Sequence, residues 1–564
     1  MTTPYPDSTE LKDNFSIFHL ALRHQVTYQT FKACYPRLEQ HNWQLHEYLE
    51  TDPYPKRQLQ RTFLPKAIFT PYAHESLFGQ TWLDRVPGNS FAQQHKAVLK
   101  ERLNPNGKIC PYPENLLLTQ KQDSETWWTN PLQLNFRDKI LVFTIEWVDL
   151  WLFADNTGIL AFKTKLKQVQ RADQVSTPRL DDLNIFNRRL RYTGGPLGAS
   201  QVMVRNANNP TQTIRFWEEL AYSQWLGLNN QNNQNVLMLG QNKEKILDRY
   251  TRYSKLFTVA QMANIQSGES EFIWNRPITD PDFTAKADYT QFTNGQGSPQ
   301  LDAYQHLMLN GYPNMRDMLL LELATTSGEG QSWHGERKWQ YDTHYVKRLL
   351  TNNSIKIWSY WNALALRDIC AFISYDDNMP LLRKKQVESL YYPLYIFVYH
   401  QRFRLDCFSQ EVIDYNLGDC VKSRNLLENF HAFHNQYCFN EVTVDFQGIE
   451  ITDKMRQGLE VDNKYKVVDQ EIKTISGFID RKMQAGRQIL IAFLILAFYP
   501  FQYFGLGKVF HSLVEKSQIW QIVGLNVAFF LLIIWLFWWV VPRRLGFLCR
   551  LFARVYHRHQ DNSP

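Results

Sequence analysis

Two apolar stretches near the C-terminal end of the sequence constrain the fold more than any other feature. They cover residues 489–506 and 522–541, with a short polar connector between them. The second contains Asn526 as its one strongly polar residue, and about twenty such residues in a helix match the hydrocarbon thickness of a bilayer. The first is interrupted by Pro500 and Gln502, so a buried hairpin helix is its alternative. The pair predicts a transmembrane hairpin.

Basic residues on either side of the two stretches predict their orientation. Lys482 and Arg487 precede the first stretch and five arginines follow the second, whereas the connector holds two lysines and one glutamate. By the positive-inside rule, both termini are cytoplasmic. The polar start of the chain also lacks the apolar core of a signal peptide. We therefore expect an integral protein of the bacterial inner (plasma) membrane, with the lipid bilayer as a partner.

Charge and cysteine usage narrow the class of protein further. The net charge is +7, and the tail after Val541 supplies five arginines against one aspartate, which leaves about +3 for the rest. Such a balance excludes the basic footprint of a nucleic-acid-binding protein. The seven cysteines form no CxxC pair, which is typical of free thiols in a reducing compartment.

The cytosolic part reads as a sheet followed by long helices. Runs rich in β-branched and aromatic residues on both sides of 155–158 predict a β-hairpin, whereas the spacing of apolar residues in 14–34 favours a helical or irregular segment. Apolar residues recur at helical spacing over 345–374, 381–408 and 411–438, and Pro393 marks a kink or a boundary.

The predicted fold class is therefore an α+β cytosolic domain with long helices, followed by a two-helix C-terminal transmembrane hairpin. The predicted boundaries are 1–342 for the α/β domain, 343–487 for the long helices and stalk, 488–507 for the first transmembrane helix, 508–521 for the external connector, 522–542 for the second helix and 543–564 for the basic tail.

A regular apolar seam precedes the first apolar stretch. Its members, spaced four, three, four and four residues apart, are Val468, Ile472, Ile475, Ile479 and Met483. This spacing predicts a short coiled-coil-like stalk, and a helix that packs on its own domain is the alternative. No proline intervenes before Pro500, so the helix is expected to run unbroken into the first stretch and to act as a gating lever.

Motifs that carry chemistry are absent or incomplete. The glycine-rich segment 193–200 lacks the lysine of a phosphate-binding loop. His431, His434 and Cys438 share a helix face and could ligate zinc, but ordinary surface residues are the favoured reading. No hydrolase, metalloprotease or kinase motif occurs. We predict that the chain is not an enzyme, and the residues alone assign no metal site and no cofactor.

The end of the first apolar stretch carries the residues of a family resemblance. It reads Phe504-Gly505-Leu506-Gly507, and it follows a large cytosolic domain, long helices and an extended helix. This plan resembles the CorA-like magnesium transporter superfamily, in which an aromatic residue and a Gly-Met-Asn signature end the first span. Phe504 and Gly505 match that signature, whereas Leu506 and Gly507 replace its Met and Asn.

The resemblance implies a homopentamer whose first spans line a central pore, and a divalent cation as the bound ion. The implied pore or signature positions are Gln502, Tyr503, Phe504, Gly505, Leu506 and Gly507. The expected function is an oligomeric membrane ion channel or transporter of altered selectivity, gated by its cytosolic domain. The alternative is a membrane-anchored cytosolic sensor or effector in defence or stress signalling, whose hairpin serves anchoring and oligomerisation.

Overall fold

The structure is a computed structural model of the 564-residue chain. The residues that it describes are 10–23, 43–45, 70, 73, 116–120, 128–153, 155–171, 174–192, 202–218, 254–262, 315–326, 342–358, 361–374, 387–413, 420–438, 441–443 and 445–503. Near the end of this range, residues 490 and 493–503 are described by their backbone alone.

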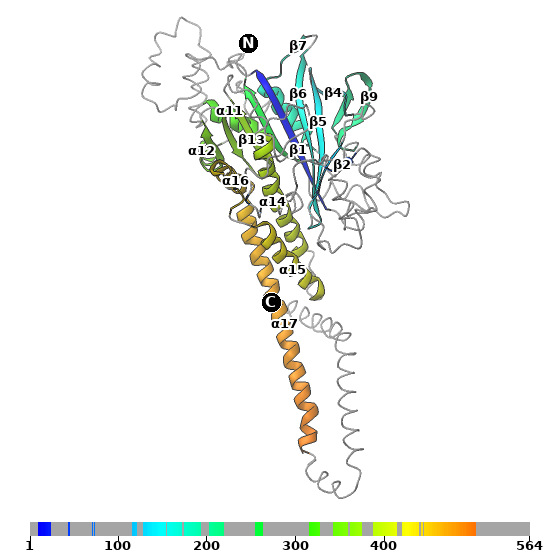
Figure 1. Cartoon of the computed structure of the whole chain (residues 1–564), viewed down its shortest axis with the longest axis vertical. Coiled ribbons are helices and arrows are strands. Elements are labelled where there is room, and N and C mark those ends of the chain that lie inside the picture. Colours follow the sequence, from blue (N-terminus) through cyan, green and yellow to red (C-terminus); the bar gives the residue numbers. More distant parts are fainter. Residues whose placement is uncertain are drawn as a thin grey trace, which may run out of the picture. The chain divides into compact units, whose positions relative to one another are not determined.

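The described strands form one thirteen-stranded sheet (Figure 1). The strands are β1 (Leu11–Arg23), β2 (Trp43–Leu45), β3 (Leu116–Gln120), β4 (Leu132–Phe136), β5 (Lys139–Leu152), β6 (Thr157–Arg171), β7 (Gln174–Ser176), β8 (Met203–Asn206), β9 (Asn209–Arg215), β10 (Lys255–Met262), β11 (Ser354–Trp358), β12 (Trp361–Ala365) and β13 (Ile369–Ser374). Along the main path the order is β11-β12-β13-β10-β1-β6-β5-β4-β8-β9. β10 and β13 run parallel, and the other pairs of described strands are antiparallel.

The described helices lie mostly in the second half of the chain. They are α5 (Leu180–Leu190), α6 (Phe216–Glu218), α11 (Met315–Thr325), α12 (Thr343–Asn353), the π-helical turn η6 (Val387–Tyr391), α14 (Tyr392–Ile413), α15 (Cys420–Tyr437), α16 (Phe446–Gly458) and α17 (Val461–Tyr503). As Pro393 indicated, the chain changes conformation there: η6 ends and α14 begins one residue before it.

The predicted hairpin at 155–158 is confirmed as the turn between β5 and β6. Asn156 takes a left-handed backbone conformation (φ 65°), which Asn tolerates better than most residues. Gly158 follows because a Cβ atom there would lie 2.9 Å from the carbonyl oxygen of Trp151. Local turn chemistry therefore fixes the register of the two longest strands.

Side chains of the central strand β1 alternate between two covered faces of the sheet. On one face, Phe18 stacks on Phe162 and meets Phe186 of α5 edge-on. On the other face, the next residue, His19, contacts Tyr392 and Tyr395 of α14. The sheet is thus a central layer with helices packed on both sides.

The chain divides into two compact units. The sheet unit comprises residues 1–404 and 436–462, and the helical unit comprises 405–435 and 463–564. α14, α15 and α17 each contribute residues to both units.

Two segments differ from the sequence-based expectations. The expected helical or irregular segment at 14–34 begins as strand β1, because both faces of this strand are buried and the apolar pattern loses its two-residue period. Residues 354–374, expected in a long helix, form strands β11 to β13. Only 343–353 of that stretch is helical.

The predicted transmembrane hairpin is contradicted. Within the described residues, which include α17 up to Tyr503, no helix is long and apolar enough to cross a membrane. The physical reason is length: the described apolar part of α17, 489–503, falls short of the roughly twenty residues that a span requires, and Arg487 lies just before it. The fold class and the localisation as an integral membrane protein are corrected accordingly. The second stretch, 522–541, lies outside the described residues.

The coiled-coil-like stalk is also corrected. α17 is one unbroken helix of 43 residues (Figure 1), but four of the five seam residues, from Val468 to Ile479, are buried in the single chain. Along this part of α17, Tyr465 stacks on Phe430 of α15 and Ser409 of α14 donates a hydrogen bond to Glu471. The seam spacing therefore serves packing within the helical unit. Met483, in contrast, is 53% exposed.

Candidate functional site

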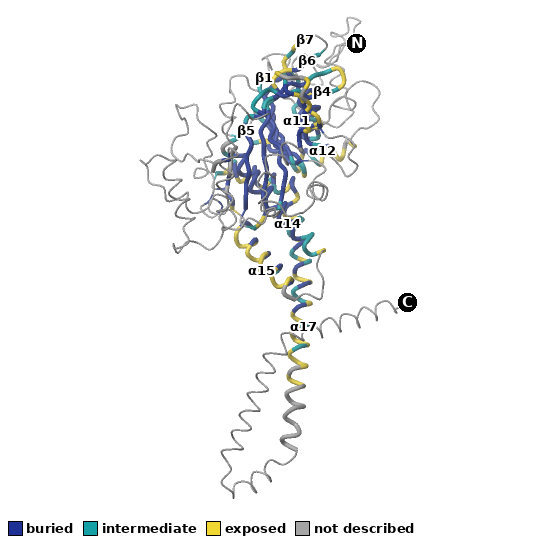
Figure 2. Tube along the Cα trace, turned by 90° about the vertical axis from the view of Figure 1, so that its right-hand side faces the viewer, coloured by how far each residue is buried: buried dark blue, intermediate teal, exposed yellow. Residues whose placement is uncertain are grey.

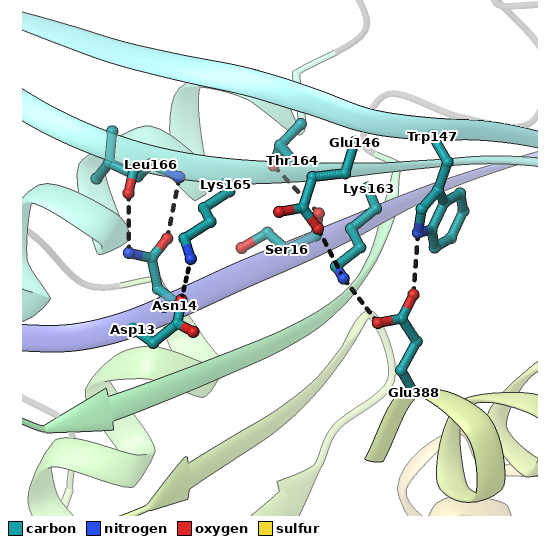
Figure 3. Close-up of polar contacts among 10 residues, drawn as sticks. All are labelled: Asp13, Asn14, Ser16, Glu146, Trp147, Lys163, Thr164, Lys165, Leu166 and Glu388. Atoms are coloured by element: carbon teal, nitrogen blue, oxygen red, sulfur yellow. Dashed lines mark hydrogen bonds and ion pairs between the residues drawn. The ribbon is translucent and has the colours of Figure 1, made fainter. Parts of the chain in front are cut away.

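A buried ion cluster joins the sheet to the start of α14 (Figure 3). Lys163 of β6 lies at its centre, with Nζ 2.7 Å from Oε2 of Glu388 in η6 and 2.8 Å from Oε2 of Glu146 in β5. The same ammonium lies over the ring of Phe15, 4.6 Å from its centroid. Two carboxylates and one aromatic face thus surround a single cation that is 5% exposed.

A β-bulge places Glu146 within reach of Lys163. In the β5–β6 pairing, Ile145 opposes Thr164 and Trp147 opposes Lys163, so Glu146 is an extra residue in β5. A bulge of this kind redirects side chains and commonly occurs beside functional sites. Because of it, Glu146 and Trp147 both reach the cluster although they are sequence neighbours.

Glu388 is held at both carboxylate oxygens. Oε2 accepts from Lys163, and Oε1 accepts a 3.0 Å hydrogen bond from Nε1 of Trp147. Glu388 lies in η6, and π-helical turns are rare and occur frequently at functional sites. Three side-chain contacts therefore fix an unusual backbone turn to the sheet.

The electrostatics of the cluster favour a permanently charged lysine. Burial opposes the charge of Lys163, but Glu388 and Glu146 outweigh that effect and raise its pKa above the ordinary value. An amine with a raised pKa is protonated at neutral pH and is no nucleophile. The cluster can therefore hold η6 in place, but Lys163 is unsuited to covalent catalysis.

Beyond η6, the first turns of α14 cover a histidine on β1. Nδ1 of His19 lies 3.3 Å from the carbonyl oxygen of Lys255, and Nε2 lies 3.1 Å from the hydroxyl of Tyr392. Since a carbonyl can only accept, Nδ1 carries the proton and Tyr392 donates to Nε2. Burial lowers the pKa of His19 to about 3, with a small opposing effect of the Lys255 carbonyl. His19 is thus a neutral, structural imidazole.

A second polar contact fixes α14 to the tip of the β5–β6 hairpin. Oδ2 of Asp155 lies 3.0 Å from Nε2 of His400 and 3.6 Å from Nε of Arg404. Burial opposes the charge of Asp155, but these two partners outweigh it and hold the pKa below its usual range. The ring of His400 also stacks on Phe153, with centroids 3.8 Å apart. This pair resembles a catalytic dyad in geometry, yet His400 is fully buried.

The sequence-predicted site residues are not brought together with these clusters. Gln502 and Tyr503 form the end of α17, and 504–507 lie outside the described residues. His434 accepts or donates a 2.7 Å hydrogen bond with Tyr465. In the described part of the chain, no group of three or more His, Cys, Asp or Glu side chains is arranged to hold a metal ion.

Sequence reasoning missed the Lys163 cluster. Lys163 and Glu388 are separated by 225 positions, and nothing in the local sequence pairs them. The bulge at Glu146 depends on strand register, which the sequence does not reveal. The only available signal was a lysine within an apolar strand pattern, because buried lysines require a partner.

Comparisons with family models, with curated proteins and with solved structures found no match to this chain. The CorA-like resemblance stays a prediction from the sequence.

Proposed function

We propose that this protein is a self-associating sensor or effector, in which the state of the sheet unit reaches the helical unit through α14. The observation that carries the proposal is the arrangement of this helix. Its π-helical start is fixed to the sheet by the Lys163 cluster, and its last residues, from Leu405, belong to the helical unit. A change at the cluster would therefore act on an element that both units share.

The exposed face of α17 supports self-association. Val467, Phe478, Ala485 and Ile489 are all exposed, and they are spaced eleven, seven and four residues apart, which places them on one face of the helix. Figure 2 shows the later described turns of α17 as exposed. From Asp480 to Ala492, the residues whose burial is described are exposed or half-buried. A solitary helix of this length is marginal in water and gains stability from a partner.

A second copy of the chain is the partner that this face fits. Each copy presents the same apolar strip, so an isologous contact buries it on both sides. Glu471 and Lys482 flank the strip, one acidic and one basic, so two copies offer each other opposite charges. The pentamer implied by the family resemblance is one possible copy number.

Light scattering on the full-length protein over a range of concentrations tests self-association. Phe478→Glu places a charge in the centre of the strip and should yield monomers, whereas Val175→Glu, at an apolar residue of β7 that is 62% exposed, should leave the mass unchanged. A monomeric wild type, or an oligomer that survives Phe478→Glu, would refute this part of the proposal.

The relay through α14 is tested with the ion cluster. Lys163→Met should change the monomer–oligomer equilibrium, because it releases Glu388 and η6 from the sheet. Lys165→Met, which removes the half-exposed partner of Asp13 on the same strand, should not. Equal association of all three proteins would show that the sheet unit does not influence self-association.

Ion transport depended on the transmembrane hairpin and is not part of this proposal. The proposal likewise assigns no enzymatic activity and no cofactor.

A further inference from the structure

A cluster of arginines surrounds one phenylalanine at the turn between β4 and β5. The guanidinium of Arg189, in the last turn of α5, lies 4.5 Å from the ring centroid of Phe136. The guanidinium of Arg137, in the turn itself, lies 5.3 Å from the same centroid. Arg188 is the sequence neighbour of Arg189, and all three arginines are exposed. Three cations are thus gathered around a half-buried aromatic ring.

The cluster carries uncompensated positive charge. Nearby Lys139 and Arg171 are neutralised by buried Asp182, at 3.4 Å and 2.5 Å. Within the described part of the chain, in contrast, Arg188 and Arg189 form no ion pair. Burial and the charges of Arg188 and Arg137 all lower the pKa of Arg189. The neighbours that act on Arg189 are therefore repulsive, although Asp138 lies in the same turn.

The backbone at Arg137 adds an independent observation. Phe136 and Lys139 form the last pair of the β4–β5 hairpin, so Arg137 and Asp138 make up a two-residue turn. Arg137 has a φ of 52°, in the left-handed region that favours Gly or Asn. Backbone strain of this kind is concentrated at functional sites. Here it holds a third guanidinium beside Arg189 in spite of the repulsion.

We propose that Phe136, Arg137, Arg188 and Arg189 form a binding site for the phosphate group of a small molecule. Guanidinium groups bind phosphate oxygens through paired, charge-assisted hydrogen bonds, and a phosphate dianion would neutralise two of the three cations. The ring of Phe136 holds the arginines in position. Because both guanidinium groups already lie over this ring, the site recognises the phosphate and has no aromatic face left for a nucleobase. It does not depend on the proposed self-association.

Calorimetric titration of the full-length protein with inorganic pyrophosphate tests the site, with potassium chloride at matched ionic strength as the reference. Wild type should bind pyrophosphate, and Arg189→Gln should weaken binding at least about tenfold, as expected for a lost charge-assisted hydrogen bond. Arg348→Gln is the matched control, because Arg348 also lies over an exposed aromatic ring, Tyr345, but as a single contact. Its affinity should equal that of wild type.

Thermal unfolding separates a binding role from a structural one. Arg137→Gly removes a guanidinium and suits the left-handed φ, so without ligand it should unfold at or above the wild-type temperature while binding pyrophosphate more weakly. Absence of binding by wild type up to about 10 mM would overturn the proposal. So would equal weakening by Arg348→Gln, or unchanged binding in both cluster variants.

Discussion

At the scale of single residues, buried charge decides which side chains hold the sheet unit together. Lys163 has two carboxylate partners and is 5% exposed, whereas Lys165, two positions along the same strand, has one partner and is 24% exposed. Removal of one member of a buried ion cluster leaves the others uncompensated in a poor solvent for charge, whereas surface pairs contribute little.

Lys163→Met should therefore lower the free energy of unfolding by about 3 kcal/mol. Lys165→Met should lower it by less than about 1 kcal/mol. Denaturant unfolding of both variants measures the difference. Equal losses would mean that the cluster behaves as an ordinary surface ion pair.

His19 makes stability depend on pH in a defined direction. Its pKa is about 3 in the folded protein and near 6.5 in the unfolded chain, so unfolding takes up a proton between these values. The contribution of His19 is thus fully present above pH 6.5 and is lost progressively as the pH falls toward 3. His19→Gln cannot titrate but can still accept from Tyr392. Its stability should fall less between pH 7 and pH 5, and identical pH profiles would contradict this role.

At the scale of elements, two glycines lie in contrasting surroundings. A Cβ atom on Gly458, at the end of α16, would lie 2.3 Å from the carbonyl oxygen of Ala365 in β12. On Gly486, within α17, it would meet nothing within 4 Å. One glycine permits a close helix–strand contact, and the other only weakens a helix.

Gly458→Ala should accordingly lower the free energy of unfolding by about 1–3 kcal/mol or more, because backbone has to move. Gly486→Ala should raise helix stability by up to about 1 kcal/mol. Thermal melts followed by circular dichroism distinguish the two. A neutral Gly458→Ala would indicate that α16 does not pack closely on β12.

Elements were predictable from the sequence where local chemistry determines them. The turn at Asn156 and the boundary near Pro393 both depend on backbone preferences of one or two residues. β1 was missed because Phe15 and Phe18 are buried on opposite faces, which removes the alternation that marks a strand. The Lys163 cluster was unpredictable for another reason: it assembles from three elements distant in the chain, and its geometry depends on a bulge.

At the scale of the whole molecule, self-association should couple stability to concentration. When the folded oligomer dissociates on unfolding, a higher protein concentration raises the unfolding temperature. Wild type should show this shift over a hundredfold dilution series, and Phe478→Glu should not. A concentration-independent transition in wild type would argue for a monomer.

The place of β1 in the sheet has a consequence for biosynthesis. β1 is hydrogen-bonded to β6 on one side and to β10 on the other, and about ninety residues separate the ends of these two partners along the chain. At roughly 5–20 residues per second, a ribosome would leave one edge of β1 unpaired for roughly 5–20 s after β6 has emerged. An apolar strand with an open edge readily pairs with other chains. Efficient production of this protein should therefore depend on chaperones that bind nascent chains during that interval.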